Sequence, residues 1–307
     1  MRTLLFRKDR DVLLATFILT VATALAFAPD AFLPMLARAF LLEWVVVFLL
    51  TLAWAVWRRS AWTAAASALA CLMVLLQLDA PVAPTLHQQT EATLRVAQMN
   101  VLQPNRRHAE VVRLALDSDA DVISFQEVSE AWAVVLEQEL GPAYPFHRIV
   151  PGDHCYGIAL FSRLPLDRVN VLVLEDTPVI EAVVRSGKGA VRMFSMHANS
   201  PGSWGDHRRR NAQLEQLATI VRSSAMPTVV VGDLNTVSWD RAMWRLCLNS
   251  GLRVGTASYS PTFPSLFGLA LIPIDHLLVS PGAAVVESHT FFIPGSDHRG
   301  LIVDVAT

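Results

Sequence analysis

Cysteine is scarce in this sequence of 307 residues, which holds only Cys71, Cys155 and Cys247. No spacing between them matches a zinc site or a Cys-x-x-Cys redox motif, so the sequence gives no sign of cysteine-based metal or redox chemistry. We expect Cys155 and Cys247 to be unpaired thiols. A disulfide between these two stays open as an alternative if they lie outside the cytoplasm, where disulfides persist.

The sequence also lacks internal repeats, low-complexity tracts and a surplus of basic residues. Its length allows one large domain or two smaller units. Residues 80–307 contain 18 of the 25 lysines and arginines and 22 of the 27 aspartates and glutamates, a formal charge of −4. A surface that binds duplex nucleic acid is usually strongly basic. The charge therefore weighs against nucleic acid as the partner.

Apolar residues, in contrast, are abundant and unevenly distributed. They make up 53% of the chain, the mean hydropathy is +0.40, and three apolar stretches of 18 residues lie near the N-terminus: Val12–Pro29, Phe40–Trp57 and Ala61–Leu78. Each approaches the about 20 residues that a helix needs to cross a bilayer. We therefore predict three transmembrane helices and a membrane anchor over residues 1–80. A cleavable signal peptide ending near "AFAPDA" is the alternative for the first stretch.

The basic residues around these stretches predict their orientation. Four of the first ten residues are basic, Arg58 and Arg59 separate the second and third stretches, and only Arg38 lies between the first and second. Loops rich in Lys and Arg face the cytoplasm, which leaves everything after Leu78 on the other side. The predicted location is a bacterial-type inner or plasma membrane, crossed several times, with an extracytoplasmic C-terminal domain.

Residues 81–92 are rich in Pro, Gln and Thr and are predicted to form a linker, followed by a globular domain over residues 93–307. Short β-type runs in this domain alternate with helical patterns such as His108–Leu116 and Arg209–Val221. Between Tyr156 and His197, strands follow one another without helices, as in hairpins. Together these patterns predict a layered α/β sandwich with two sheets.

Polar residues gather where the predicted strands end. The segments are "VAQMNVLQ", "DVISFQEVSE", "MFSMHANSPGSW", "VVVGDLNT", "IPIDHLLVS" and "GSDHRGLIVDV". A single one, such as Asp233 and Asn235 in "GDLNT", is explained by a turn. Six together form a rim of four carboxylates and three imidazoles, which would repel itself without a cation or an anionic ligand. The sequence therefore predicts a binding or catalytic site at this rim.

These segments resemble the motifs of the endonuclease/exonuclease/phosphatase superfamily, which includes DNase I, abasic-site endonucleases and neutral sphingomyelinases. The motifs follow the family order: Asn100, "FQEV" (125–128), "GIALFSRLP" (157–165), "MHANSP", "GDLNT", "IDHLLVS" and "SDHRGLIVDV". The resemblance covers Thr93–Val305 and implies a DNase I-like four-layer α/β/β/α sandwich, here preceded by three transmembrane helices. An N-terminal anchor before this domain resembles the membrane-anchored bacterial branch that includes teicoplanin-resistance phosphatases.

The resemblance implies a metal site. Glu127 matches the principal metal carboxylate of the family, Asp297 would join the metal or its water shell, and the implied cofactor is Mg²⁺ or Mn²⁺, which suit hard oxygen ligands. Asn100 would orient a metal-bound phosphate oxygen or complete the metal shell. The alternative for Glu127 is an ordinary acid preceding Ser129 at a helix N-terminus.

The resemblance also implies the catalytic residues. Asp233 matches the carboxylate that activates the attacking water, and Asn235, two residues on and so expected on the same face, would donate a hydrogen bond to the phosphoryl oxygen. His298 matches the histidine that contacts the scissile phosphate, with Asp275 as its orienting carboxylate. His197 would contact a phosphate oxygen.

Other polar and apolar features have open interpretations. His276 is expected to point to the opposite face from Asp275 and to be structural, whereas Asn199 belongs either to the site or to a turn. Arg208–Arg210 form either a solvated helix face or a contact for an anionic headgroup. The apolar segment 260–270 suits a lipid substrate if it is exposed, and otherwise packs against the sandwich.

The predicted function is that of a membrane-tethered, Mg²⁺-dependent phosphoesterase that hydrolyses a phosphate ester or pyrophosphate outside the cytoplasm. Its expected partners are the bilayer and a phosphorylated, lipid-linked substrate. An anchored extracytoplasmic endo- or exonuclease is the alternative with the same catalytic residues, but it would need a basic surface for the phosphate backbone. A non-catalytic binding protein is the third alternative.

Overall fold

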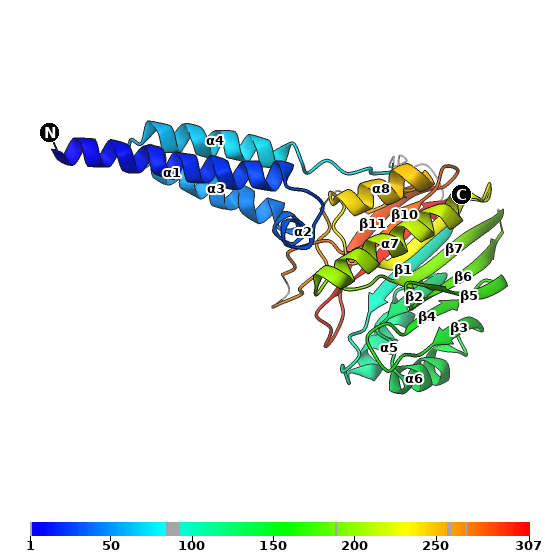
Figure 1. Ribbon diagram of the computed structural model, residues 1–307. Coiled ribbons are helices and arrows are strands. Elements are labelled where there is room, and N and C mark those ends of the chain that lie inside the picture. Colours follow the sequence, from blue (N-terminus) through cyan, green and yellow to red (C-terminus); the bar gives the residue numbers. More distant parts are fainter. Residues whose placement is uncertain (1, 84–92, 188, 257–258, 268) are drawn as a thin grey trace. The chain divides into compact units, whose positions relative to one another are not determined.

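The computed structural model describes residues 2–83, 93–187, 189–256, 259–267 and 269–307 (Figure 1). The chain divides into two compact units, Met1–Asp79 and Ala80–Thr307. Most of the predicted linker, positions 84–92, lies outside the described residues. Its described part belongs to the second unit, because Val82 forms a parallel bridge to Val254 and the Ala83 N–H donates to Val254 O at 2.7 Å.

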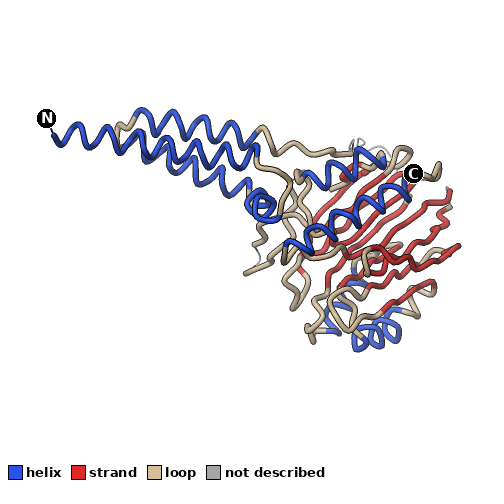
Figure 2. The backbone as a smooth tube through the Cα atoms, in the orientation of Figure 1, coloured by secondary structure: helices blue, strands red, loops and turns tan. Residues whose placement is uncertain are grey.

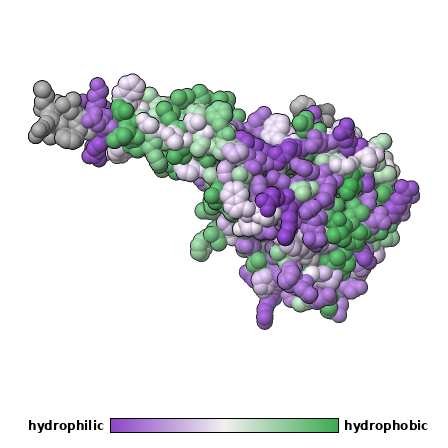
Figure 3. Space-filling model, in the orientation of Figure 1, coloured by the Kyte–Doolittle hydropathy of each residue, from purple (hydrophilic) through white to green (hydrophobic). Residues whose placement is uncertain are grey.

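The N-terminal unit is helical. It contains α1 (Arg2–Phe27), α2 (Phe32–Ala39), α3 (Leu41–Trp57) and α4 (Ala61–Leu75). Helix α4 packs along both α1 and α3, and the Asp11 carboxylate accepts hydrogen bonds from the backbone N–H and the hydroxyl of Thr63. On the face seen in Figure 3, the surface of this unit is mainly hydrophobic.

The helices of this unit differ in their capacity to cross a membrane. Among the described residues, one helical segment is long and apolar enough by itself, the 20 residues Lys8–Phe27 of α1. Helices α2 and α3 pass the same test only as a pair, which is bent by 65°. Helix α4 is apolar but has 15 residues, fewer than the about 20 of a full crossing. The described residues thus contain one or two candidate spans, where the sequence predicted three.

The second unit contains two six-stranded sheets (Figure 2). The first has the order β11 (Ala284–Phe292), β12 (Arg299–Ala306), β1 (Leu94–Asn100), β2 (Val122–Gln126), β4 (Ile158–Ser162) and β3 (Phe146–Val150). The second has the order β5 (Leu166–Leu174), β6 (Thr177–Ser186), β7 (Gly189–His197), β8 (Thr228–Asp233), β10 (Asp275–Val279) and β9 (Arg253–Val254).

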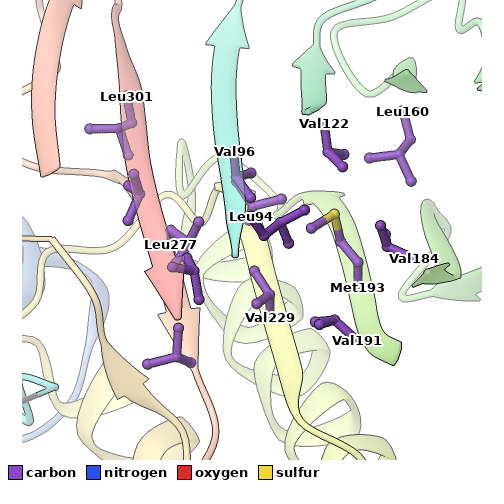
Figure 4. Close-up of a cluster of buried hydrophobic side chains, with 14 of the residues drawn as sticks. Leu94, Val96, Val122, Leu160, Val184, Val191, Met193, Val229, Leu277 and Leu301 are labelled. Atoms are coloured by element: carbon purple, nitrogen blue, oxygen red, sulfur yellow. The ribbon is translucent and has the colours of Figure 1, made fainter. Parts of the chain in front are cut away.

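The sheets and helices form four layers. Side chains from both sheets make the central hydrophobic core, which includes Leu94 and Leu160 from the first sheet and Met193 and Val229 from the second (Figure 4). A second core packs the first sheet against α5 (His108–Asp117) and α6 (Glu130–Leu140). A third packs the second sheet against α7 (Trp204–Arg222) and α8 (Arg241–Ser250). The predicted α/β/β/α sandwich is confirmed.

The sequence patterns missed three strands, β3, β9 and β11. All three lie at the edges of their sheets, and β3 and β11 are only partly buried. An edge strand with few buried residues shows a weak apolar period, which explains why the pattern "FHRIV" of β3 was not recognised. The central strands, which carry the predicted site residues at their ends, were all predicted.

Two parallel pairs bring the predicted site together. Strand β1 runs parallel to β2, and β7 runs parallel to β8. The carboxyl ends of parallel neighbours meet at one edge of a sheet, and β1 also faces β8 across the central core. The ends of β1, β2, β7 and β8 therefore converge on one rim of the sandwich.

Candidate active site

Strand β8 ends on Asp233, and its two neighbours place further predicted site residues beside it. His197 of β7 and Asp275 of β10 both lie opposite Asp233 in the strand registers, so the three side chains share one face. All three are buried. Gly232 has a φ of 147°, and a Cβ at this position would lie 1.9 Å from Met196 O. Glycine therefore permits the close approach of β7 and β8 beneath the site.

Asn100, at the end of β1, joins the two sheets. Its Nδ2 lies 3.2 Å from Glu127 Oε1 and 3.2 Å from Asp233 Oδ2, and its Oδ1 accepts the Leu102 N–H. A side-chain amide has two N–H groups, and the two carboxylates use both. The 3.4 Å approach to His298 Nε2 is therefore a contact without a donated proton. One amide thus links carboxylates from both sheets.

His298 and Asp275 form a buried pair. The His298 Nδ1–H donates to Asp275 Oδ2 at 2.8 Å, and Asp275 Oδ1 accepts from Gln98 Nε2 at 2.7 Å. The other nitrogen of the ring, Nε2, lies 3.7 Å from Asp233 Oδ2. The pairing holds the imidazole with Nε2 facing Asp233, the arrangement predicted for Asp275 as orienting carboxylate.

The charges around His298 favour its protonated form. Burial by itself lowers the pKa of this imidazole, but Asp275 and, further, Asp233 and Asp297 outweigh that effect and raise the pKa to about 10. His298 is therefore an imidazolium at neutral pH and can donate from Nε2 to an anionic oxygen.

His197 contacts Asp233 from the other side. Its Nδ1–H donates to Cys155 O at 2.8 Å, and its Nε2 lies 3.4 Å from Asp233 Oδ2. Burial by itself lowers the pKa of His197, but the neighbouring Asp233 outweighs this effect and raises it. Burial by itself raises the pKa of Asp233, but His197 and His298 outweigh this effect and bring the pKa below its usual value. Asp233 is therefore an ionised carboxylate. Cys155 contributes only its backbone oxygen to this contact, and Cys155 and Cys247 are free thiols, as predicted.

Asn235 lies near the site in an unexpected conformation. Its φ is 48°, so the alternation of an extended strand does not continue to this residue, and the argument that placed it on the same face as Asp233 does not hold. Its N–H donates to Asp233 Oδ1 and its Nδ2 donates to Ala198 O, both at 2.9 Å. Asn235 thus fixes Asp233 and ties β8 to the end of β7. Its contact with a phosphoryl oxygen stays a prediction.

The carboxylates suit a hard divalent cation. Asp233, Asp275 and His298 offer ligand atoms within 4.8 Å of one another. Protonated His298 has no lone pair to give, whereas metal ligands must be deprotonated. The candidate ligands are therefore the carboxylate oxygens of Asp233, Asp275, Glu127 and Asp297.

Two further observations support this fit. Asp297 Oδ1 is buried and has no hydrogen-bond partner within the described part of the chain, a situation that a bound cation relieves. Glu127 Oε2 accepts the Gln103 N–H at 3.0 Å, so one oxygen is held in place beside Oε1, which faces Asn100. The chemistry of these carboxylates therefore suits a hard divalent cation, and the roles of Glu127 and Asp297 as its ligands stay predictions.

Two predicted residues lie outside the reactive cluster. His276 is opposite Gly232 in register and donates from Nε2 to Thr236 O at 2.7 Å; burial lowers its pKa, so it is a neutral structural residue. Asn199 is held by Gln213, whose Oε1 accepts the Asn199 N–H at 2.9 Å. Asn199 therefore takes the turn role rather than a place in the site.

Two residues that support the site were not predicted from the sequence. Gln98 donates to both Asp275 and Gln126 and lies two residues before Asn100 on β1, a polar residue at an alternate position of an apolar strand. Phe263 places its ring 4.8 Å from the His298 ring. A polar Gln98 inside the apolar strand "VAQMN" could have indicated a buried hydrogen-bonding role, whereas no local pattern predicts the position of Phe263 beside His298.

Arg210 corrects the interpretation of Arg208–Arg210 as one solvated helix face. Arg208 and Arg209 are exposed, but Arg210 is fully buried. Its Nη1 donates to Asn235 O at 2.8 Å, which supports the segment after Asp233. The burial of Arg210 could have been predicted from helical spacing, because Arg210 precedes the buried Leu214 and Leu217 by four and seven residues and so lies on the same helix face.

Comparison with solved structures supports the fold of the second unit. Among curated proteins, no sequence matches the chain. An endonuclease/exonuclease/phosphatase structure from Beutenbergia cavernae DSM 12333 has a TM-score of 0.58 at 19% identity, covering 70% of this chain and 72% of that one. The mannosyl-6-phosphatase of Bacteroides thetaiotaomicron VPI-5482 has a TM-score of 0.57 at 18% identity, covering 70% and 100%. Sphingomyelinase C from Streptomyces griseocarneus has a TM-score of 0.55 at 18% identity, covering 70% and 99%.

At these identities the likeness is one of fold. The sequence itself carries the classification, because residues 96–298 match a single family over most of the chain's length. Both ends of the match fall within the sandwich, on β1 and at His298 of the rim. The chain belongs to the endonuclease/exonuclease/phosphatase family.

Proposed function

We propose that this protein is a membrane-tethered phosphoesterase that uses a divalent metal ion to hydrolyse a lipid-linked phosphate ester or pyrophosphate outside the cytoplasm. Hydrolysis of a phosphoric ester is the reaction class that family membership indicates. The observation that carries the proposal is the buried Asp233, which lies within 3.7 Å of both His197 and His298 and is linked through Asn100 to Glu127.

Two side chains would act directly on the reacting groups. His298, an imidazolium at neutral pH, would donate from Nε2 to a phosphoryl oxygen and stabilise the charge that develops there. Asp233, kept ionised by the two histidines, would orient the attacking water and accept its proton.

Three further side chains would position these groups. His197 would hold the second side of Asp233 and contact a phosphate oxygen, and Asp275 would keep His298 in the productive tautomer. Asn100, which approaches both carboxylates, would keep the water-orienting group beside the metal-binding group. The result is a preorganised set of donors, which is the main source of rate enhancement in such sites.

Glu127 and Asp297 would hold the metal, with Asp233 as a third source of oxygen. A bound Mg²⁺ or Mn²⁺ would screen the negative charge of the substrate phosphate. Glu127 is held in advance by the Gln103 N–H, so little ordering would be needed when the metal binds. Asp297 Oδ1 would gain in the metal or its water shell the partner that the described residues do not give it.

The tether is proposed from the N-terminal helices. Residues 8–27 of α1 are long enough for a span, α2 and α3 would form a bent second span, and α4 would complete a third crossing with its flanking residues. Many apolar side chains of these helices are exposed, among them Leu13, Leu50 and Trp57. The basic residues near the N-terminus and Arg58–Arg59 would face the cytoplasm. A tethered site meets substrates in or near the bilayer, which favours lipid-linked phosphates.

A substrate panel tests the proposal. The full chain is purified in detergent and assayed against a polyprenyl pyrophosphate, sphingomyelin, an inositol phosphate and plasmid DNA, each with Mg²⁺ and with EDTA. We expect Mg²⁺-dependent turnover of a lipid-linked substrate and its loss in Asp233→Asn. The Arg113→Met variant, whose exposed residue lies on α5 outside the site, is the control and should retain activity.

The other outcomes separate the alternatives. Cleavage of DNA in preference to every lipid would assign the site to a nuclease, against the charge of −4 on residues 80–307. Binding of a substrate without turnover, by both the wild type and Asp233→Asn, would assign it to a non-catalytic binding protein.

A further inference from the structure

Residues 262–267 and 269–272, together named here the apolar hairpin, lie next to the reactive histidine. Phe263 and Ile272 form an antiparallel bridge, and Leu266 and Leu269 form another nearer the tip. At the base, Phe263 places its ring 4.8 Å from that of His298, and the Ser265 N–H donates to Asp297 O at 2.6 Å. The hairpin is therefore fixed to two predicted site residues, His298 and Asp297.

The tip of the hairpin exposes large apolar side chains. Phe267 is fully exposed, and Leu269 and Leu266 are 74% and 57% exposed. Contiguous exposed apolar groups of this kind mark surfaces that bind a partner or a membrane. The base, in contrast, is buried at Thr262 and Ile272, and Leu271 is 41% exposed, so exposure is greatest near the tip.

Two features favour a bilayer as the occupant of this surface. No charged residue occurs between Val254 and Ile274, whereas protein-binding surfaces are usually rimmed by polar and charged groups that pair with the partner. The backbone near the tip also satisfies its own hydrogen bonds: the Leu266 N–H donates to Leu269 O at 2.8 Å and the Leu269 N–H to Leu266 O at 2.9 Å. Internal pairing of this kind is what the hydrocarbon region of a membrane requires.

We propose that the apolar hairpin inserts Leu266, Phe267 and Leu269 into the surface of the bilayer and thereby presents lipid phosphates to His298. The proposal rests on the proposed lipid-linked substrate and specifies how that substrate reaches the site. The chain's own candidate membrane span, Lys8–Phe27, would keep the second unit near a bilayer, so a shallow contact through three side chains is sufficient. Because the hairpin has no charge, its insertion should depend little on salt or on anionic lipids.

The first test measures insertion directly. Phe267→Cys in the full chain is labelled with an environment-sensitive dye and reconstituted into phosphatidylcholine vesicles that contain lipids with nitroxide groups on their acyl chains. The control is Leu248→Cys on α8, a single exposed leucine, and the labelled parent protein gives the background from Cys155. We expect strong quenching at position 267, little at 248, and the same result at low and high salt.

The second test separates lipid access from chemistry. The double variant Phe267→Ser/Leu269→Ser is compared with Leu248→Ser on a polyprenyl pyrophosphate in vesicles and on a water-soluble aryl phosphate. Burial of one large apolar side chain changes a partition constant by about tenfold or more, so the double variant should lower kcat/KM on the vesicle substrate at least about tenfold and leave the soluble substrate unchanged.

Each result has a defined meaning. A dye at position 267 that is not quenched overturns the proposal, and if that dye is also shielded from aqueous iodide, the hairpin is covered by protein instead. An equal loss of rate on both substrates also overturns it, because the hairpin would then support only the geometry of His298. If neither substrate is hydrolysed by the wild type, the proposed function fails, while the quenching experiment still decides whether the hairpin inserts.

Discussion

Replacement of Arg210 by methionine should strongly destabilise the second unit. The guanidinium is fully buried, donates from Nη1 to Asn235 O at 2.8 Å, and lies 4.0 Å from Asp240 Oδ1. Methionine keeps most of the length but removes the charge and the donors, so Asp240, which is 2% exposed, loses a buried positive charge beside it. Removing one partner of a buried ion pair typically destabilises by about 3–5 kcal/mol.

The geometry places the expected effect at the lower end of that range. Asp240 also caps α8 by accepting the Ala242 N–H at 2.7 Å, so its carboxylate keeps one strong hydrogen bond in the variant. We therefore expect a loss of about 3 kcal/mol, against the about 5–15 kcal/mol that stabilise a typical domain. With a urea dependence of about 2–3 kcal/mol per molar, the unfolding midpoint should fall by about 1–1.5 M.

Pulse proteolysis of the full chain across a urea series measures this shift of the unfolding midpoint. The fragment that corresponds to the second unit is followed separately on a gel. Arg209→Met is the matched control: the neighbouring side chain is exposed and lies 3.7 Å from Asp206, and loss of a surface pair changes stability by less than about 1 kcal/mol. Arg210→Lys keeps the charge but not the planar donor geometry and should fall between the two. Equal midpoints for Arg210→Met and Arg209→Met would refute the reasoning.

The remaining predictions concern the site and the topology. Glu127→Gln should lower activity and shift the Mg²⁺ requirement upward, with partial recovery at high Mg²⁺; an unchanged metal titration would remove Glu127 from the metal site. Asp233→Asn and His298→Ala should each reduce the single-turnover rate by about 10²–10³, with circular dichroism as folding control, and the double variant should lose less than the product; a variant that keeps a tenth of the rate contradicts its assigned role. The pKa of His298 is raised to about 10 from an ordinary 6.5. The stability that this shift contributes is fully present below pH 6.5 and is lost as the pH rises through about 10. The urea midpoint of unfolding, measured in EDTA, should therefore decline over this pH range, and it should decline less in Asp275→Asn. A C-terminal alkaline phosphatase fusion should be active and a C-terminal GFP fusion dark; the opposite pattern contradicts the extracytoplasmic orientation.

The convergence of the site could be predicted from the sequence because strand geometry is regular. Asn100, His197 and Asp233 end central strands whose apolar runs are unmistakable, and parallel neighbours end at one edge. The contact between His298 and Asp275 was expected from the family resemblance, whereas the register that places Asp275 opposite Asp233 was not predicted.

Other features depend on geometry that no local pattern contains. Asn235 leaves the extended conformation at φ 48°, so the alternation failed two residues beyond the end of β8 at Asp233. Phe263 reaches His298 from a separate loop. In the N-terminal unit, composition predicted three apolar stretches, but where each helix breaks depends on packing, and the third ended as the 15-residue α4.

Because Asn100 holds Glu127 of one sheet and Asp233 of the other, the site straddles a seam between two separately hydrogen-bonded sheets. No backbone ladder sets their relative position. That alignment depends on side chains between the sheets, through the packing of the central core and through hydrogen bonds such as Gln98 to Asp275. A slip of about 1 Å between the sheets would break the 3.2 Å contact of Asn100 with Asp233 without unfolding either sheet. The packing of apolar side chains distant from the reacting groups therefore determines how the site residues are aligned. On heating, activity should be lost before the strands of either sheet separate.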